Sequence, residues 1–435
     1  MFRPLPCTTL AWLASALVTQ GLLPGAVDAQ GPTASAPGSI EIRIAPRDYL
    51  IAHEARVPGA GYHGTSPYYD LVVQTISFLN RSDRPVTLEG GTIELLAGGD
   101  LLQQTAISKA EMLRTQTAAV EITKMNFPDA LDVEYSAKSL VPEGFTFSPT
   151  LTLAPRSVGL VDDYYLVVRS RPDQLRITAR GRDEAGVECT GTLTVPIRTY
   201  QSKNAYAWPL EPGEWFVVAF PGLHSHHRWT ATTEHGLDIT MVDSRGSWAQ
   251  GGAADWRTGK VAHWEDWYAY DKKVLAAAAG VVVKVVNDVA FPLEFWNRRA
   301  GETLEAYRER IGQRQMELFM APGADAMSVA GGNHVVIRHA NDEYSFYAHL
   351  AYGSVRVKVG QAVVQGEHIA GVGGTGEAPA VHLHFQVSDS PSMTTSRTFP
   401  VHFSNIHVNE AFADSFEPTL FFQPGFFITT ARLPE

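Results

Sequence analysis

The sequence predicts an all-β protein in two parts: an N-terminal β-sandwich, and a second, antiparallel β domain with a helical insertion. Three observations lead to this prediction. Short segments of alternating apolar and polar residues recur about every ten residues from Ile40 to Thr199. The composition then changes across a polar, proline-containing stretch at residues 202–213, after which most tryptophans and histidines occur. Within the second part, Glu302–Met320 has the apolar spacing of a helix rather than a strand.

Size and charge restrict the class of protein. The chain has 435 residues, of which 45% are hydrophobic and 19% charged, so it can form folded domains with apolar cores. Its formal charge of -11 and the lack of a dense basic run exclude a protein that follows nucleic-acid phosphates, and we expect no nucleic-acid partner. Two cysteines cannot build a disulfide framework or a thiolate zinc cluster. Thirteen of the 15 histidines lie between His224 and His407, so a bound metal would need histidine and carboxylate ligands.

The first element, residues 1–29, has the features of a signal peptide. Arg3 precedes an apolar run from about Leu10 to Leu23, and small residues at Val27 and Ala29 suit cleavage before Gln30. The run is short for a membrane span and contains polar residues, so we expect no integral membrane segment after cleavage. Residues 30–39, rich in Gly, Pro and Ser, are expected to be a flexible linker. These features predict a periplasmic or secreted protein.

The second element, residues 40–200, is predicted to be an immunoglobulin-like β-sandwich. Residues 80–85 carry turn-forming types between two strands and predict a hairpin turn. The region has no cluster of His, Asp or Glu that would form a site. The alternating segments are 40–45, 70–79, 92–98, 151–157, 164–170, 175–181 and 191–197.

The third element, residues 205–435, combines further strands with one insertion at about 291–330. Within the insertion Leu304, Tyr307, Ile311 and Leu318 share one helix face, which either packs onto the sheet or forms a lid or groove wall. The tryptophan-rich stretch 248–270 is long for a β connection and is either core packing or the wall of a substrate groove. The predicted strands are 215–220, 237–242, 273–286, 334–339, 344–350, 354–360, 367–373 and 381–387.

The strongest motif is the pair His382 and His384. Residues two apart on a strand point to the same face, so both imidazoles are presented together. His349 ends another predicted strand, and Asp238 stands at the head of a third. Zinc takes histidine nitrogens and a carboxylate oxygen, and a catalytic zinc site keeps one position for water. Histidine and aspartate at these strand ends therefore predict a zinc site.

These motifs resemble those of the lysostaphin/LytM-type zinc metallopeptidases. The resemblance rests on YAHL at 347–350, KVGQAVVQGEHIAGVGGTG at 358–376 and VHLHF at 381–385, and it runs from about Trp215 to Val401. It implies an antiparallel β metallopeptidase domain that cleaves peptide cross-links of peptidoglycan. By the same resemblance, His384 and Asp238 are zinc ligands, and His349 and His382 are catalytic histidines.

The remaining ligand departs from the family pattern. The usual motif places a histidine four residues before the aspartate, where this chain has Glu234, and His235 is one position out of register. A subgroup of the family has Asn-His-His farther ahead of the aspartate, and Ser225-His226-His227 is similar to it. We therefore expect His227 to be the third zinc ligand, with His235, His226 and Glu234 as alternatives.

The resemblance implies an exported zinc metalloendopeptidase that hydrolyses peptide bonds of peptidoglycan stems or cross-bridges with a zinc-activated water. The sequence contains neither a His-Glu-x-x-His motif nor a Gly-x-Ser-x-Gly motif, so other common hydrolase sites are not indicated. Two alternatives remain: a catalytically inactive relative that regulates or binds cell-wall amidases, and a hydrolase acting on a protein outside the wall.

Overall fold

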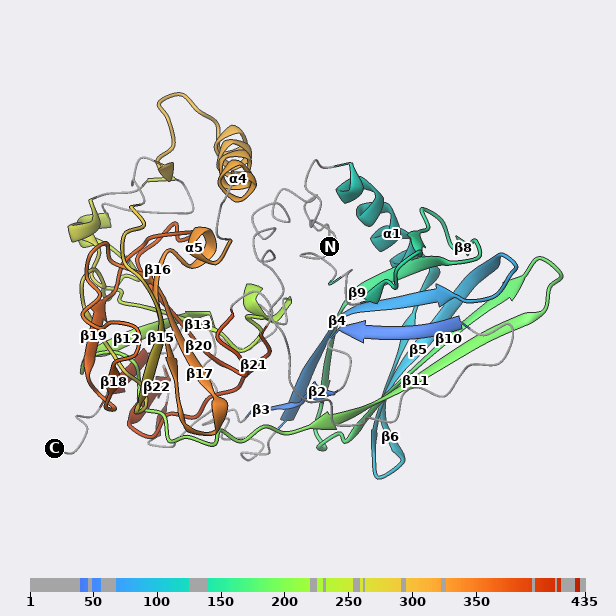
Figure 1. Cartoon of the computed structure of the whole chain (residues 1–435), viewed down its shortest axis with the longest axis horizontal. Helices are drawn as coiled ribbons and strands as arrows, with labels where there is room; N and C mark the ends of the chain where they lie inside the picture. The colour runs from blue at the N-terminus through green and yellow to red at the C-terminus, as the bar shows by residue number, and fades with distance from the viewer. Residues whose placement is uncertain are drawn as a thin grey trace. The chain divides into compact units, whose positions relative to one another are not determined.

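In the computed structural model the described residues form two compact units, one within residues 40–54 and 68–199 and the other comprising Ala55 and the described residues from 200 to 430 (Figure 1). The residues that the structure describes are 40–45, 49–55, 68–124, 136, 140–219, 225–229, 232–252, 259–260, 263–290, 295–321, 326–392, 396–410, 413–415 and 427–430. The predicted signal peptide and linker lie outside these residues. Among the described residues, no helix is both long enough and apolar enough to span a membrane.

The N-terminal unit contains two sheets that share one apolar core. The first sheet has the order β1-β4-β9-β7, with β3 beside β4, and the second has the order β2-β11-β10-β5-β6, with β8 beside β5. Phe78 of β4 and Ile93 of β5 belong to the same buried cluster, so the sheets pack face to face. The strands are β1 Ile40–Ala45, β2 Leu50–Ile51, β3 His53–Ala55, β4 Tyr68–Asn80, β5 Val86–Ala97, β6 Asp100–Ile107, β7 Thr146–Phe147, β8 Thr152–Leu153, β9 Ser157–Val168, β10 Gln174–Asp183 and β11 Glu188–Arg198.

This unit also contains helix α1, Lys109–Thr123, which the alternation pattern does not predict. The signal for it is local: Ser108 accepts a hydrogen bond from the Glu111 backbone N–H, and the Glu111 side chain accepts from the Ser108 backbone N–H. This reciprocal capping box satisfies two amide donors at the helix start. The turn predicted between β4 and β5 is present, since β4 ends at Asn80 and β5 begins at Val86.

The second unit is built around one large antiparallel sheet. Its order is β18-β15-β16-β17-β20-β13-β12-β24-β22-β23, with β21 beside β20, and β14 and β19 form a separate pair. All residues of β20 and β13 are buried, because these central strands are covered on both faces. The strands are β12 Glu214–Ala219, β13 Leu237–Thr240, β14 Lys273–Leu275, β15 Gly280–Val286, β16 Asn333–Arg338, β17 Tyr344–Leu350, β18 Ala362–Val363, β19 His368–Gly371, β20 Leu383–Ser388, β21 Thr398–Phe399, β22 Ile406–Glu410, β23 Ala413–Ser415 and β24 Phe427–Thr430.

Two predictions for this unit have different outcomes. The helix predicted at 302–320 is present as α4, Leu304–Met320, capped by the Thr303 side chain, and a short helix α5, Ala326–Gly331, follows. The strand predicted at 354–360 is wrong, because this segment makes only scattered backbone bonds, among them Arg356 N–H to Ile369 O and Gly360 N–H to Val282 O. Alternation alone does not form a strand where no continuous partner is available.

A buried carboxylate fixes the beginning of the second unit. Glu343, which is 1% exposed, accepts hydrogen bonds from the Tyr200 hydroxyl, the Lys203 backbone N–H (2.9 Å), the Asn204 side chain (2.6 Å) and the Tyr206 hydroxyl (3.0 Å). Burial raises the pKa of Glu343, but these donors outweigh burial and the net pKa lies below its usual value. Residues 200–206 are thereby held beside Glu343, which directly precedes β17.

Candidate functional site

Strand register brings Asp238 and His384 together. Asp238 of β13 is paired with His384 of β20, so both side chains lie on the same face of the sheet. His384 Nδ1 lies 3.1 Å from Asp238 Oδ1, and the two residues are 3% and 6% exposed. A carboxylate and an imidazole are thus held in contact at the centre of the sheet.

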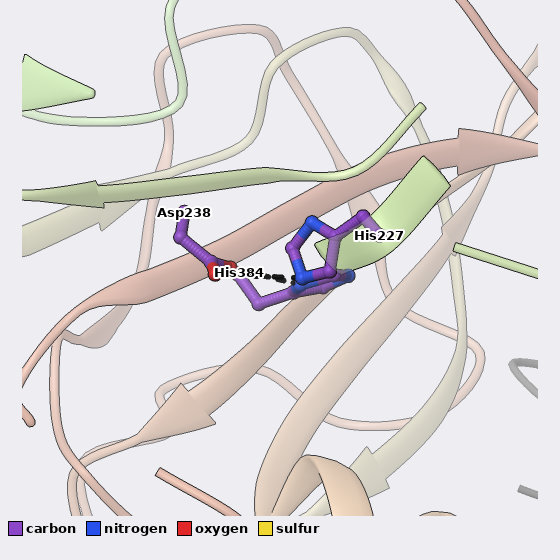
Figure 2. A group of neighbouring side chains, drawn as sticks. All are labelled: His227, Asp238 and His384. Atoms are coloured by element: carbon purple, nitrogen blue, oxygen red, sulfur yellow. Dashed lines mark hydrogen bonds and ion pairs between the residues drawn. The ribbon is translucent and has the colours of Figure 1, made fainter. Parts of the chain in front are cut away.

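His227 joins this pair from outside the sheet. It lies in the short 3-10 turn His226–Trp229, and its Nε2 is 3.4 Å from Asp238 Oδ2. One donor atom from each of His227, Asp238 and His384 lies within 4.8 Å of the others (Figure 2). Gly236 leaves room for the two rings, because a Cβ there would lie 2.8 Å from His384 Cε1 and 3.1 Å from His227 Nδ1.

The alternatives for the third position are held elsewhere. The His235 ring contacts Thr398, with Nδ1 3.2 Å from the Thr398 carbonyl oxygen. The Glu234 carboxylate lies 3.3 Å from the Arg228 guanidinium, which is fully buried. The side chain of His226 lies outside the described residues. Of the four candidates weighed from the sequence, His227 is the one that the structure groups with Asp238 and His384.

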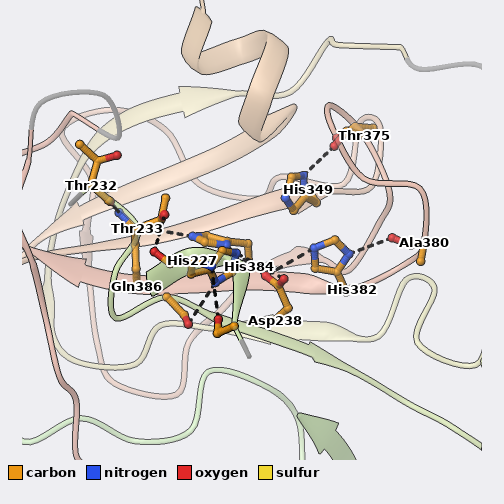
Figure 3. Close-up of polar contacts among 12 residues, drawn as sticks. His227, Thr232, Thr233, Asp238, His349, Thr375, Ala380, His382, His384 and Gln386 are labelled. Atoms are coloured by element: carbon orange, nitrogen blue, oxygen red, sulfur yellow. Dashed lines mark hydrogen bonds and ion pairs between the residues drawn. The ribbon is translucent and has the colours of Figure 1, made fainter. Parts of the chain in front are cut away.

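Hydrogen bonds on the far side of each ring fix which nitrogen carries the proton. A carbonyl oxygen only accepts, so His227 Nδ1 must donate to Gly236 O (3.2 Å) and His382 Nδ1 must donate to Ala380 O (2.9 Å). For His384 the partner is Gln386, whose amide nitrogen donates to Thr232 O (3.0 Å) and whose Oε1 therefore accepts from His384 Nε2 (2.9 Å; Figure 3). In the neutral form, each ring then turns its unprotonated nitrogen toward Asp238.

This arrangement fits a cation. His227 Nε2, His384 Nδ1 and His382 Nε2 lie 3.4, 3.1 and 3.6 Å from carboxylate oxygens of Asp238. Lone pairs that face a carboxylate repel it unless a positive charge lies between them, and protonating all three rings would bury three cations around one anion. Two imidazole nitrogens and a carboxylate oxygen are also a donor set that zinc prefers.

His349 reaches the same face through an irregularity in β17. Ala348 is paired with His384, so in a regular strand the next residue would point to the opposite face. The register between β16 and β17 shifts here, and His349 has φ +59°, in the left-handed region that costs a non-glycine residue about 1–3 kcal/mol. Its ring centroid lies 4.6 Å from that of His382, and its Nδ1 donates to Thr375 O (2.9 Å).

His349 is held in its neutral form. Burial lowers its pKa well below the usual value, and the nearby His382 and His384 rings lower it further, against the smaller opposing effects of the Thr375 carbonyl and Asp238. A neutral imidazole with its Nδ1 proton fixed offers Nε2 as a proton acceptor.

The helical insertion contacts the loop that carries Thr375. Gln315 of α4 donates to Glu377 Oε1 (2.8 Å), and the Glu377 backbone N–H donates to Ala330 O (2.9 Å) at the end of α5. Burial raises the pKa of Glu377 to about 8. The insertion therefore packs beside the wall of the site.

Three residues of the site have contacts that the motifs do not predict, although Thr375 lies within the motif at 358–376. Gln386 continues the period-two series after His382 and His384, and this periodicity could have identified it. Thr375 acts through its backbone carbonyl and Gly236 through the absence of a side chain, and neither leaves a side-chain signal in the sequence.

The comparisons with known proteins agree with the motifs. Residues 323–395 match the model of peptidase family M23. Over 62 residues (14% of the chain) the sequence is 40% identical to the cell division protein DipM of Caulobacter vibrioides, and over 55 residues (13%) it is 44% identical to the peptidoglycan DD-endopeptidase ShyC of Vibrio cholerae. These matches span only 10% and 12% of the two relatives.

Solved structures of peptidases are also similar. The catalytic domain of lysostaphin from Staphylococcus simulans is 18% identical, covering 43% of this chain and 88% of that one, with a TM-score of 0.22. The M23 protein EnpA from Enterococcus faecalis is 14% identical, covering 46% and 89%, with a TM-score of 0.22. The segment that carries His349, His382 and His384 therefore matches peptidase family M23, and the motifs within it resemble those of the LytM type.

Proposed function

We propose that this protein is an exported zinc metalloendopeptidase that hydrolyses peptide bonds in peptidoglycan stems or cross-bridges. The observation that carries the proposal is the convergence of unprotonated nitrogens from His227 and His384 on the Asp238 carboxylate, with His349 and His382 beside them. The match of residues 323–395 to a peptidase family supports peptide hydrolysis, and the predicted signal peptide at residues 1–29 supports export.

The ligands in this proposal are His227 Nε2, Asp238 and His384 Nδ1. Zinc held by them would supply Lewis acidity, polarising the scissile carbonyl and lowering the pKa of a water toward about 7. The protein itself fixes the ligands: Gly236 O orients His227, and Gln386 orients His384. Such outer contacts keep the rings in the tautomer that binds metal.

We assign the proton transfers to His349 and His382. The carbonyls of Thr375 and Ala380 hold the Nδ1 proton of each ring, which leaves Nε2 as the nitrogen that exchanges a proton. One of the two would take the proton of the attacking water, and the other would donate a hydrogen bond to the oxygen that becomes negative in the transition state.

Metal content tests the proposal first. Protein lacking residues 1–29 should contain about one zinc per chain, and His384→Ala and His227→Ala should each lose it. His235→Ala is the matched control, because its ring contacts Thr398 instead, and it should keep zinc. Loss of zinc in His235→Ala together with retention in His227→Ala would overturn the ligand assignment.

Product analysis tests the reaction. Incubation with cross-linked peptidoglycan should release fragments in which mass spectrometry identifies a cleaved peptide bond, and His349→Ala should release none. A zinc-containing protein that leaves all cross-links intact would favour a regulator of cell-wall amidases over an endopeptidase.

A further inference from the structure

Two neighbouring pockets, the first of which reaches the candidate site at Thr375, are not used by the proposed chemistry. The first, about 460 Å³, is lined by the aromatic side chains of Trp264, Tyr270 and Tyr352 together with Gly374 and Thr375. We call it the aromatic pocket. The second, about 350 Å³, shares Tyr270 and Tyr352 with the first. It adds Asp271, Ser354, Arg356 and His368, and we call it the polar pocket. Both volumes fall in the usual range for small-ligand sites, about 300–1,000 Å³.

Thr375 connects the aromatic pocket to the proposed catalytic histidine His349. Thr375 lines it, and the Thr375 carbonyl oxygen is the atom that accepts the His349 Nδ1 proton at 2.9 Å (Figure 3). Thr375 is itself fixed, because its hydroxyl accepts from the Asn333 backbone N–H (2.9 Å) and donates to Leu350 O (2.8 Å). A group bound in this pocket would therefore lie against the residue that fixes His349, where a neighbouring part of the same substrate can reach.

The aromatic wall is built closely onto the loop of Thr375. A Cβ on Gly374 would lie 2.6 Å from Trp264 Cζ3, so the indole packs directly on the Gly374 backbone. The Trp264 and Tyr270 rings are nearly parallel, with an angle of 10° and a centroid distance of 6.3 Å. Tyr352 is 62% exposed, which is unusual for a large aromatic ring at a pocket rim and leaves its face available to a ligand.

This combination of surfaces matches a sugar ring. The C–H bonds on one face of a pyranose are apolar with partial positive charge, and they pack on the negative face of an aromatic ring. The hydroxyls at the ring edge need both donors and acceptors, which Arg356, Asp271 and Ser354 supply in the polar pocket. Peptidoglycan is the substrate class that carries peptides on amino sugars.

We propose that the aromatic pocket, with its polar neighbour, binds an N-acetylhexosamine of the glycan strand to which the cleaved peptide is attached. This inference rests on the proposed peptidoglycan endopeptidase function and adds a saccharide requirement to it. Tyr352 and Trp264 provide the stacking surface, and Arg356 and Asp271 bind the hydroxyl or acetamido groups.

The experiment compares two substrates with the same cross-linked peptide, one carrying its disaccharides and one from which an amidase has removed them. The full chain without residues 1–29 should show a kcat/KM at least about tenfold higher for the sugar-bearing substrate, the ratio that about 1.4 kcal/mol of stacking provides. Tyr352→Ala should remove this preference and leave kcat/KM for the bare peptide unchanged. Val364→Ala, at a position of similar exposure (67%), is the control and should behave as the wild type.

Other outcomes separate this inference from the proposed function. Equal rates on both substrates, or an equal loss on both in Tyr352→Ala, would overturn the saccharide site while leaving the endopeptidase in place. If neither substrate is cleaved, the disaccharide alone is titrated into the protein and tryptophan fluorescence is followed. Saturable binding that Tyr352→Ala abolishes would then support the saccharide site, and absence of binding would refute it.

Discussion

Replacing Gln386 by leucine should weaken zinc binding without unfolding the protein. Gln386 is fully buried, and its two amide atoms bond His384 Nε2 at 2.9 Å and Thr232 O at 3.0 Å. Leucine has a similar size and supplies neither bond. The His384 ring then loses the acceptor that fixes its tautomer, and loss of such a partner lowers metal affinity by about 10–100-fold. This corresponds to about 1.4–2.7 kcal/mol of binding free energy.

The loss of stability should be of similar size. A buried His384 N–H without an acceptor costs about 1–3 kcal/mol, whereas Thr232 is half-buried and its carbonyl can bond to water. Competition titration with a chromophoric chelator at neutral pH measures the zinc affinity. Thermal unfolding with a chelator present measures the effect on the metal-free fold.

Gln386→Glu is the matched control for this prediction. Its carboxylate still accepts from His384 Nε2 but cannot donate to Thr232 O, so zinc affinity should remain close to that of the wild type. If leucine leaves the affinity unchanged, the tautomer argument is wrong. If glutamate weakens zinc binding as much as leucine does, the bond to Thr232 is the one that matters.

Three further predictions concern stability. Burial raises the pKa of Glu377 to about 8. Between about pH 4.5 and 8 the folded protein therefore keeps a proton that the unfolded chain releases, and the stability of the fold decreases as pH rises through this interval. Part of this side chain is exposed, so we expect Glu377→Gln to be more stable than the wild type by only about 1–2 kcal/mol above pH 8 and equally stable at pH 4. Urea unfolding of both proteins at several pH values measures this difference, and a difference that does not change with pH would contradict the prediction. The pKa of Glu343 is lowered in the folded protein, so its contribution to stability is present above the pKa of the unfolded chain and is lost as pH falls through the folded pKa. Glu343→Gln should therefore cost about 1–3 kcal/mol of stability at pH 7, and this difference from the wild type should vanish in acid. Gly374→Ala should displace Trp264, with a red-shifted fluorescence and a loss of about 1–3 kcal/mol, whereas Gly213→Ala, whose nearest neighbouring atom is 3.6 Å away, should be neutral.

The limits of the sequence are clearest at helix α1 and at residues 354–360. Alternation of apolar and polar residues identifies a strand well where long strands pair with it on both sides, as for β10 between β5 and β11. It predicts a strand at 354–360 that finds no continuous partner, and it passes over α1, whose capping box is a separate local signal. Whether a segment pairs depends on what the rest of the chain places beside it, and periodicity does not contain that information.

By itself, the sequence determined the β class of the chain and the pair His382 and His384. Both follow from the period of two along a strand, a property of neighbouring residues. For the third position the sequence resemblance favoured His227 but left His235, His226 and Glu234 open. The tertiary structure places His227, eleven residues ahead of Asp238 and outside the sheet, beside Asp238 and His384, while His235 contacts Thr398. It also decided that the left-handed backbone at His349 brings its ring beside His382, and that Thr375 and Gln386 hold the ring protons of His349 and His384. These features depend on contacts between segments far apart in the chain, and a local pattern cannot encode them.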